Sequence, residues 1–174
     1  MPRRDAPSLV EAALALLDRT ASTIEQLPGD AYSKAAPGCD NATIGQHVRH
    51  LVDHYEALVC GYETERVVSY DRRERGGTVE TDTGAALDAI RSLRERLDGL
   101  DDVQLSFDVT IRVLPAPDAE EIELPSMFSR ELAFVTHHGV HHHALIKLVA
   151  RDLGVELDST FGRAPSTVKA ESGT

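Results

Sequence analysis

The segment from about Phe128 to Leu153 constrains the fold more than any other part of the chain. Apolar residues recur in it every three or four positions, which is the spacing of an α-helix. Five of the eight histidines lie within residues 137–143. At about 100° per residue, His138 and His142 share one face with several apolar side chains. Two imidazoles one turn apart can reach a single metal ion, so this segment predicts a helix that carries metal ligands.

Three further segments show the helical period, from Ser8 to Leu27, from Asn41 to about Glu65 and from Thr83 to about Leu100. Residues 103–113 instead alternate strictly between apolar and polar side chains, which is typical of a half-buried strand. A shorter strand is predicted at 121–124, across a proline-containing turn. The sequence therefore predicts an all-α fold, a four-helix bundle with a small β-hairpin inserted between the third and fourth helices.

Charge and composition exclude several classes of partner. The 174-residue chain has a formal net charge of −11, so it lacks the basic surface that binding to nucleic acid or to an anionic membrane requires. No apolar run is long enough to cross a membrane and no signal peptide is recognisable, so we expect a cytoplasmic protein. The length fits one domain, residues 1–174, of which 155–174 form a partly irregular tail.

The second predicted helix offers the remaining ligands of a metal site. His47, His50 and His54 lie on one flank of its apolar face, and spacing alone favours His47 or His54 because they are closer to that face. Three protein ligands with an open position are typical of a catalytic site, whereas four are typical of a structural one. Imidazole suits Zn, Ni, Cu and Fe alike, so the ligand type does not identify the metal.

A polar linker, residues 70–77, follows this helix and carries Arg72, Arg73 and Arg75. A solvated loop is the simplest interpretation of this run of charges. Three guanidinium groups near a site could also hold an anionic substrate, so the linker is a second candidate for ligand binding.

Two stretches resemble the metal-ligand helices of the DinB-like (DinB/YfiT-like) superfamily. In the stretch that corresponds to residues 43–54, members of the family have a ligand histidine followed by two apolar residues and an aspartate. In this chain that histidine is His50. In residues 130–146, the last two ligands of the family correspond to His138 and His142. The linker YDRRERGGTVETD and the tail FGRAPST resemble a recurring subgroup, so the resemblance covers most of the chain.

The resemblance implies an up-up-down-down bundle, a homodimer and one divalent ion on three histidines, with Zn or Ni favoured over Fe, Mn and Cu. It also implies an enzyme acting on a small molecule. Relatives include hydrolases, and S-transferases and isomerases that use a low-molecular-weight thiol such as mycothiol or bacillithiol. The alternatives are a non-enzymatic metal-binding or stress-associated protein and a metal-free helical dimerisation module. Many members carry a Gly-Gln pair after the last ligand, where this chain has Ala144 and Leu145.

Three other side chains are candidates for proton transfer or for support of the ligands. His141 and His54 lie within one turn of predicted ligands and could relay protons, or lie beside the site without taking part. Glu131 lies two turns before His138 on the same face. Its carboxylate could accept a hydrogen bond from a ligand imidazole or pair with an arginine.

Overall fold

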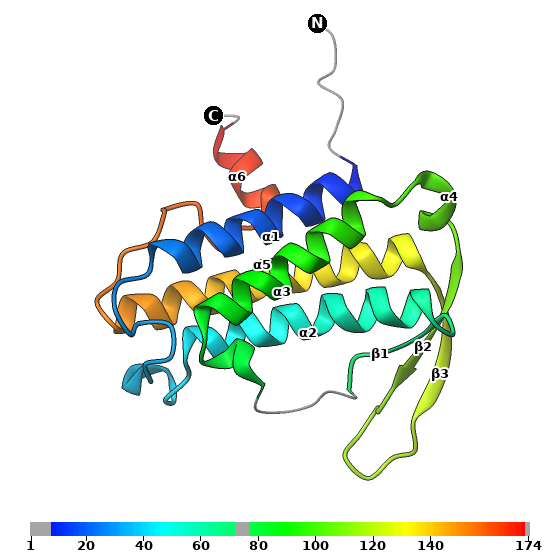
Figure 1. The fold of residues 1–174 in the computed structure, drawn as a ribbon, viewed down its shortest axis with the longest axis horizontal. Coiled ribbons are helices and arrows are strands. Elements are labelled where there is room, and N and C mark those ends of the chain that lie inside the picture. The colour runs from blue at the N-terminus through cyan, green and yellow to red at the C-terminus, as the bar shows by residue number, and fades with distance from the viewer. Residues whose placement is uncertain (1–7, 72–76, 173–174) are drawn as a thin grey trace, which may run out of the picture.

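The computed structural model describes residues 8–71 and 77–172, and four long helices form its main body (Figure 1). They are α1 (Leu9–Gln26), α2 (Ile44–Glu63), α3 (Thr83–Asp98) and α5 (Phe128–Asp152), and they confirm the predicted four-helix bundle. The shorter helices are η1 (Pro37–Cys39), η2 (Thr78–Glu80), α4 (Asp102–Leu105) and α6 (Pro165–Ser172). The linker arginines Arg72, Arg73 and Arg75 lie outside the described residues.

Capping boxes fix where two of the bundle helices begin. At α1, the Ser8 hydroxyl accepts a hydrogen bond from the N–H of Glu11, whose carboxylate accepts one from the N–H of Ser8. Thr43 and Gln46 form the same capping box at the start of α2. Each box satisfies two backbone donors that a helix N-terminus leaves unpaired. The start of α2 is therefore defined, and so is the position of the histidines that it carries.

The bundle has an order of helix directions that differs from the up-up-down-down order implied by the resemblance. Leu16 of α1 lies beside Gly139 of α5, and one turn later on both helices Thr20 lies beside His143. Helices α1 and α5 therefore run parallel. Helices α2 and α3 run the opposite way (Figure 1). The connection from α2 to α3, residues 64–82, is long enough to return to the end of the bundle where α2 begins. The order is therefore up-down-down-up.

A three-stranded sheet lies at one end of the bundle (Figure 1). Its strands are β1 (Val67–Ser69), β2 (Asp108–Val113) and β3 (Ile122–Met127). The antiparallel pair of β2 and β3 confirms the predicted hairpin, whereas β1, parallel to β2, is too short to have been predicted from an alternating pattern. The first part of the predicted strand is instead helix α4, which Asp101 and Gln104 start with a capping box.

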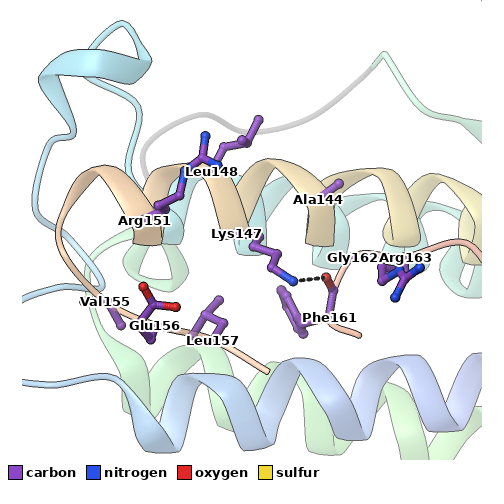
Figure 2. Close-up of a pocket in the computed structure, with 10 residues that line it drawn as sticks. All are labelled: Ala144, Lys147, Leu148, Arg151, Val155, Glu156, Leu157, Phe161, Gly162 and Arg163. Carbon is purple, nitrogen blue, oxygen red and sulfur yellow. Dashed lines mark hydrogen bonds between the residues drawn. The ribbon is translucent and has the colours of Figure 1, made fainter. Parts of the chain in front are cut away.

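The core consists mainly of aliphatic side chains from the four bundle helices, with a few rings such as Tyr55 and Phe161. Phe161 follows α5, so the tail packs on the bundle before it forms α6. Figure 2 shows this contact, in which Lys147 of α5 donates a hydrogen bond to the carbonyl of Phe161. Within the described ranges, no helix combines the length and the apolar character needed to cross a membrane. The extent of the domain, residues 1–174, stays a prediction.

Candidate metal centre

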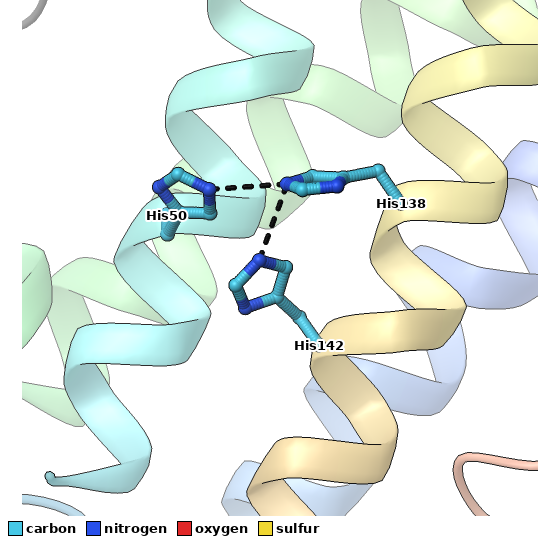
Figure 3. A group of neighbouring side chains, drawn as sticks. All are labelled: His50, His138 and His142. Atoms are coloured by element: carbon cyan, nitrogen blue, oxygen red, sulfur yellow. Dashed lines mark hydrogen bonds between the residues drawn. The ribbon is translucent and has the colours of Figure 1, made fainter.

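Three imidazoles from two helices meet where α2 packs against α5 (Figure 3). The two helices are antiparallel, so His50 of α2 faces His138 and His142, which lie one turn apart on α5. Nε2 of His138 lies 3.0 Å from Nε2 of His50 and 3.2 Å from Nε2 of His142. One nitrogen from each ring lies within 4.8 Å of the other two, so the three residues could hold one metal ion. We call these three residues the histidine triad.

The distances between these nitrogen atoms fit a metal site. Ligand nitrogens lie about 2.0–2.1 Å from Zn²⁺, so two of them in a tetrahedral site are about 3.3 Å apart. The observed 3.0 and 3.2 Å are close to that separation. A set of three imidazoles suits Zn or Ni better than it suits Mg or Ca, which prefer oxygen ligands.

Burial keeps two histidines of the triad, His138 and His142, in the neutral form that binds metal. Burial and the neighbouring His54 and His141 lower the pKa of His138 to about 4. Burial and the surrounding histidines lower the pKa of His142 to about 3. A ligand imidazole needs an unprotonated nitrogen, so both rings can bind a cation at neutral pH without first losing a proton.

His47, one alternative for the first ligand, lies beside the triad and contacts the outer nitrogen of His142. Nδ1 of His47 is 3.2 Å from Nδ1 of His142, while Nε2 of His142 faces His138. Burial lowers the pKa of His47, so its neutral ring can accept a hydrogen bond from the Nδ1–H of His142. Such a bond fixes the tautomer of a ligand imidazole and orients its other nitrogen.

His54, the other alternative, also lies against the triad. Its Nδ1 donates to the backbone carbonyl of His50 at 2.9 Å. Its ring centre is 4.3 Å from that of His50 and 4.4 Å from that of His138. His141 is exposed, and its ring centre is 5.6 Å from that of His142. Of the two predicted proton relays, His54 is therefore the more buried and the closer to the triad.

Glu131, a further predicted site residue, forms hydrogen bonds with side chains outside the triad. Its carboxylate is 1% exposed. Within the described residues, it accepts hydrogen bonds from the side chains of Tyr70, Ser126 and Arg130. The sequence left two roles open for Glu131, a hydrogen bond from a ligand imidazole or a pair with an arginine. The structure contains the pair with an arginine.

Two aromatic rings beside the triad were not predicted. The ring of Phe134 stacks on that of His138, one turn later on α5, with 5.8 Å between centres. The helical period could have indicated this contact, because the two residues share a face. The ring of Tyr70 stacks on that of His54 at 5.2 Å. Tyr70 follows β1 in a segment without periodicity, so no pattern in the sequence indicates its position.

The family model of the DinB superfamily matches residues 12–146, which include all three histidines of the triad. The chain belongs to the DinB superfamily. The match spans most of α1, all of α2 and α3 and most of α5, so it confirms the resemblance inferred from the sequence.

Two other proteins are similar to this member of the DinB superfamily. The structure of YfiT from Bacillus subtilis, described as a probable metal-dependent hydrolase with an unusual four-helix bundle topology, has a TM-score of 0.59 and 17% identity. The match covers 90% of this chain and 95% of YfiT, so the fold is shared throughout. FK506-binding protein 5 from Rhizopus delemar is 32% identical over 104 residues, 59% of this chain. The match spans 27% of the length of that curated relative.

Alanine in place of His47 is expected to weaken Zn²⁺ binding by about 10–100-fold, because partners of ligand imidazoles have effects of this size. His47→Gln should restore much of the affinity, since its amide oxygen can accept the same hydrogen bond. Competition with a chromophoric chelator measures the Kd. His137→Ala, which removes an exposed imidazole from α5, is the control. Wild-type affinity in His47→Ala would show that this contact does not support the site.

Proposed function

We propose that this protein is a metal-dependent enzyme that hydrolyses a small molecule, with the histidine triad as the ligands of one divalent ion. The observation that carries the proposal is the convergence of three Nε2 atoms, with separations of 3.0 and 3.2 Å. A Zn²⁺ or Ni²⁺ ion held by these three imidazoles would act as a Lewis acid, which could lower the pKa of a water molecule towards about 7 or bind a thiolate.

The residues around the triad would hold the ligands and move the proton. His47 would orient His142 through the contact between their Nδ1 atoms. His54 lies within 4.4 Å of the His50 and His138 rings, measured between centres, so it is well placed to accept a proton from a nucleophile. Tyr70 and Phe134 stack on these imidazoles and would limit the access of water.

Hydrolysis is our first choice because YfiT, which shares the fold, is described as a probable metal-dependent hydrolase. Thiol transfer, which the sequence resemblance also implies, would use the same ligands, with a low-molecular-weight thiol as the nucleophile in place of water. The two reactions therefore differ in the nucleophile and share the histidine triad. A non-enzymatic metal-binding protein and a metal-free dimerisation module are the alternatives to both.

Metal-loaded protein, purified without an affinity tag, is expected to turn over an activated ester such as p-nitrophenyl acetate. The rate should exceed that of His142→Ala by at least about 100-fold, because the metal supplies the nucleophile. Adding a mycothiol-type thiol and an electrophile tests the transfer reaction in the same samples. His137→Ala should keep the wild-type rate. Equal turnover by wild type and His142→Ala would contradict the proposed function.

The oligomeric state, the partners and the location stay predictions. We expect a cytoplasmic homodimer that binds a small molecule, and neither nucleic acid nor a membrane. The exposed apolar side chains of Ile122, Leu124 and Met127 on the edge strand β3 offer a surface for the second copy. Sedimentation equilibrium would test the dimer.

A further inference from the structure

A cavity of about 340 Å³ lies between the sheet and α5, and we call it the sheet–α5 cavity. Aliphatic side chains of β2 and β3, among them Val113, form its apolar wall. Tyr70, Ser126, Arg130 and Glu131 form its polar side. Pockets for small organic ligands begin at roughly this size, about 300 Å³.

Two aromatic residues connect the cavity with the metal centre. Tyr70 and Phe134 both line the cavity. The Tyr70 ring stacks on that of His54, with 13° between the planes, and the Phe134 ring stacks on that of His138, with 19°. Tyr70 and Phe134 therefore border both the cavity and the imidazoles, so a ligand in the cavity would lie beside the proposed site of reaction.

The two hydroxyl groups on the polar side of the cavity can accept a hydrogen bond from a ligand but cannot donate one to it. The Tyr70 hydroxyl donates to Oε2 of Glu131 at 2.9 Å, and the Ser126 hydroxyl donates to Oε1 at 2.6 Å. Burial and the nearby carboxylate raise the pKa of Tyr70, so the phenol keeps its proton. A hydroxyl has one proton, and both protons are used in these bonds. Each oxygen therefore has only lone pairs to offer a ligand.

Arg130 balances the charge of the buried carboxylate. Its Nη1 donates to Oε1 of Glu131 at 2.7 Å, while its own side chain is 66% exposed. The pair carries no net charge, so an ionic group on the ligand would lose its hydration without meeting an uncompensated partner. A neutral group that donates a hydrogen bond avoids this cost and matches the two acceptors.

We propose that the sheet–α5 cavity is the substrate pocket of the metal centre and binds a neutral, largely apolar molecule whose hydroxyl group donates to Ser126 or Tyr70. The role as a substrate pocket rests on the proposed function, whereas the binding chemistry does not. The apolar part of the ligand would lie along β2 and β3.

Titration of the full-length protein with benzyl alcohol and with benzyl methyl ether, followed by amide NMR shifts, tests this chemistry. Both probes contain a benzyl ring and one oxygen atom. Only the alcohol also has a hydroxyl proton that it can donate to a hydrogen bond. We expect the alcohol to bind about fivefold more tightly than the ether, the effect of one hydrogen bond. Benzoate should bind more weakly than the alcohol. An ether that binds as tightly as the alcohol, or a preference for benzoate, would overturn the proposal.

Three variants assign the binding to the cavity. Ser126→Ala should reduce the difference between alcohol and ether. Val113→Phe, which fills the apolar wall without touching a hydrogen bond of Glu131, should abolish the binding of both. Unchanged binding in Val113→Phe would contradict the proposal. His142→Ala should lose metal, measured by elemental analysis, and still bind the alcohol.

These measurements separate this inference from the proposed function. A wild-type protein that binds the alcohol in the cavity and binds no metal would refute the metal-dependent enzyme and leave the chemistry of the pocket standing. A protein that binds metal and turns over an ester, but shows no preference for the alcohol, would refute the pocket assignment alone.

Discussion

Alanine in place of His142 is expected to lower bound divalent metal from about one equivalent per chain to less than about a tenth, because a three-ligand site loses one of its ligands. Nε2 of His142 lies 3.2 Å from Nε2 of His138, and its Nδ1 contacts His47. The substitution therefore removes both a ligand and the contact that orients it. Elemental analysis after growth in metal-replete medium measures the effect.

The same substitution should remove the stabilisation by metal. A ligand that binds only the folded chain adds about 2.7 kcal/mol at a concentration one hundred times its Kd. Zn²⁺ should therefore raise the Tm of the wild type and leave that of His142→Ala unchanged. His137→Ala should behave as the wild type, since that imidazole is exposed. A wild-type protein that binds less than about a tenth of an equivalent would contradict the metal site.

Single alanine variants of the histidines on α2 identify which of them is a ligand of the metal. His50→Ala should lose metal as completely as His142→Ala, because Nε2 of His50 lies 3.0 Å from Nε2 of His138. His54→Ala should retain the metal, since its Nδ1 is bonded to the carbonyl of His50. A result in which His54→Ala loses metal and His50→Ala keeps it would reassign the first ligand.

The pair on α5 could be predicted from the sequence because the helical period alone places His138 and His142 on one face. The residue opposite them depends on how α2 slides along α5, and no period within a single helix contains that information. Spacing favoured His47 or His54, and the family resemblance pointed to His50, which is the histidine of α2 that the structure places in the triad.

Elements that are stabilised by long-range contacts also could not be predicted from local patterns in the sequence. Strand β1 has three residues and exists because it pairs with β2, more than 40 positions later in the chain. Tyr70, one of the hydrogen-bond partners of Glu131, comes from the segment after β1, 61 positions earlier in the chain. Helix α4, in contrast, could have been predicted, because Asp101 and Gln104 have the spacing of a capping box.

Alanine in place of Gly162 is expected to destabilise the protein by roughly 3 kcal/mol, the combined effect of a strained backbone and of overpacking. Gly162 has a φ of +74°, and a Cβ added to it would lie 2.6 Å from the backbone N and Cα of Ala144. Both atoms belong to α5, which cannot move without disturbing the bundle. The tail that approaches so closely buries Phe161, whose ring stacks on that of His143 at 4.3 Å.

Gly154→Ala is the matched control for this variant. Gly154 has a φ of +76°, and an added Cβ would meet nothing within 4 Å. It therefore shares the backbone strain and lacks the collision. We expect it to lose about 1 kcal/mol, since the strain of ~1–2 kcal/mol is partly offset by a stiffer unfolded chain. Urea denaturation measures both variants.

The difference between the two glycine variants reports how firmly the tail is held on α5. The tail is also attached through Lys147, whose Nζ donates to the carbonyls of Asp158 and Ser159 at 3.1 and 2.7 Å. If Gly162→Ala were no less stable than Gly154→Ala, the tail would have to detach at little cost, and the burial of Phe161 would contribute little to stability. A clearly larger loss in Gly162→Ala than in Gly154→Ala would instead show that the segment after α5 is part of the folded bundle.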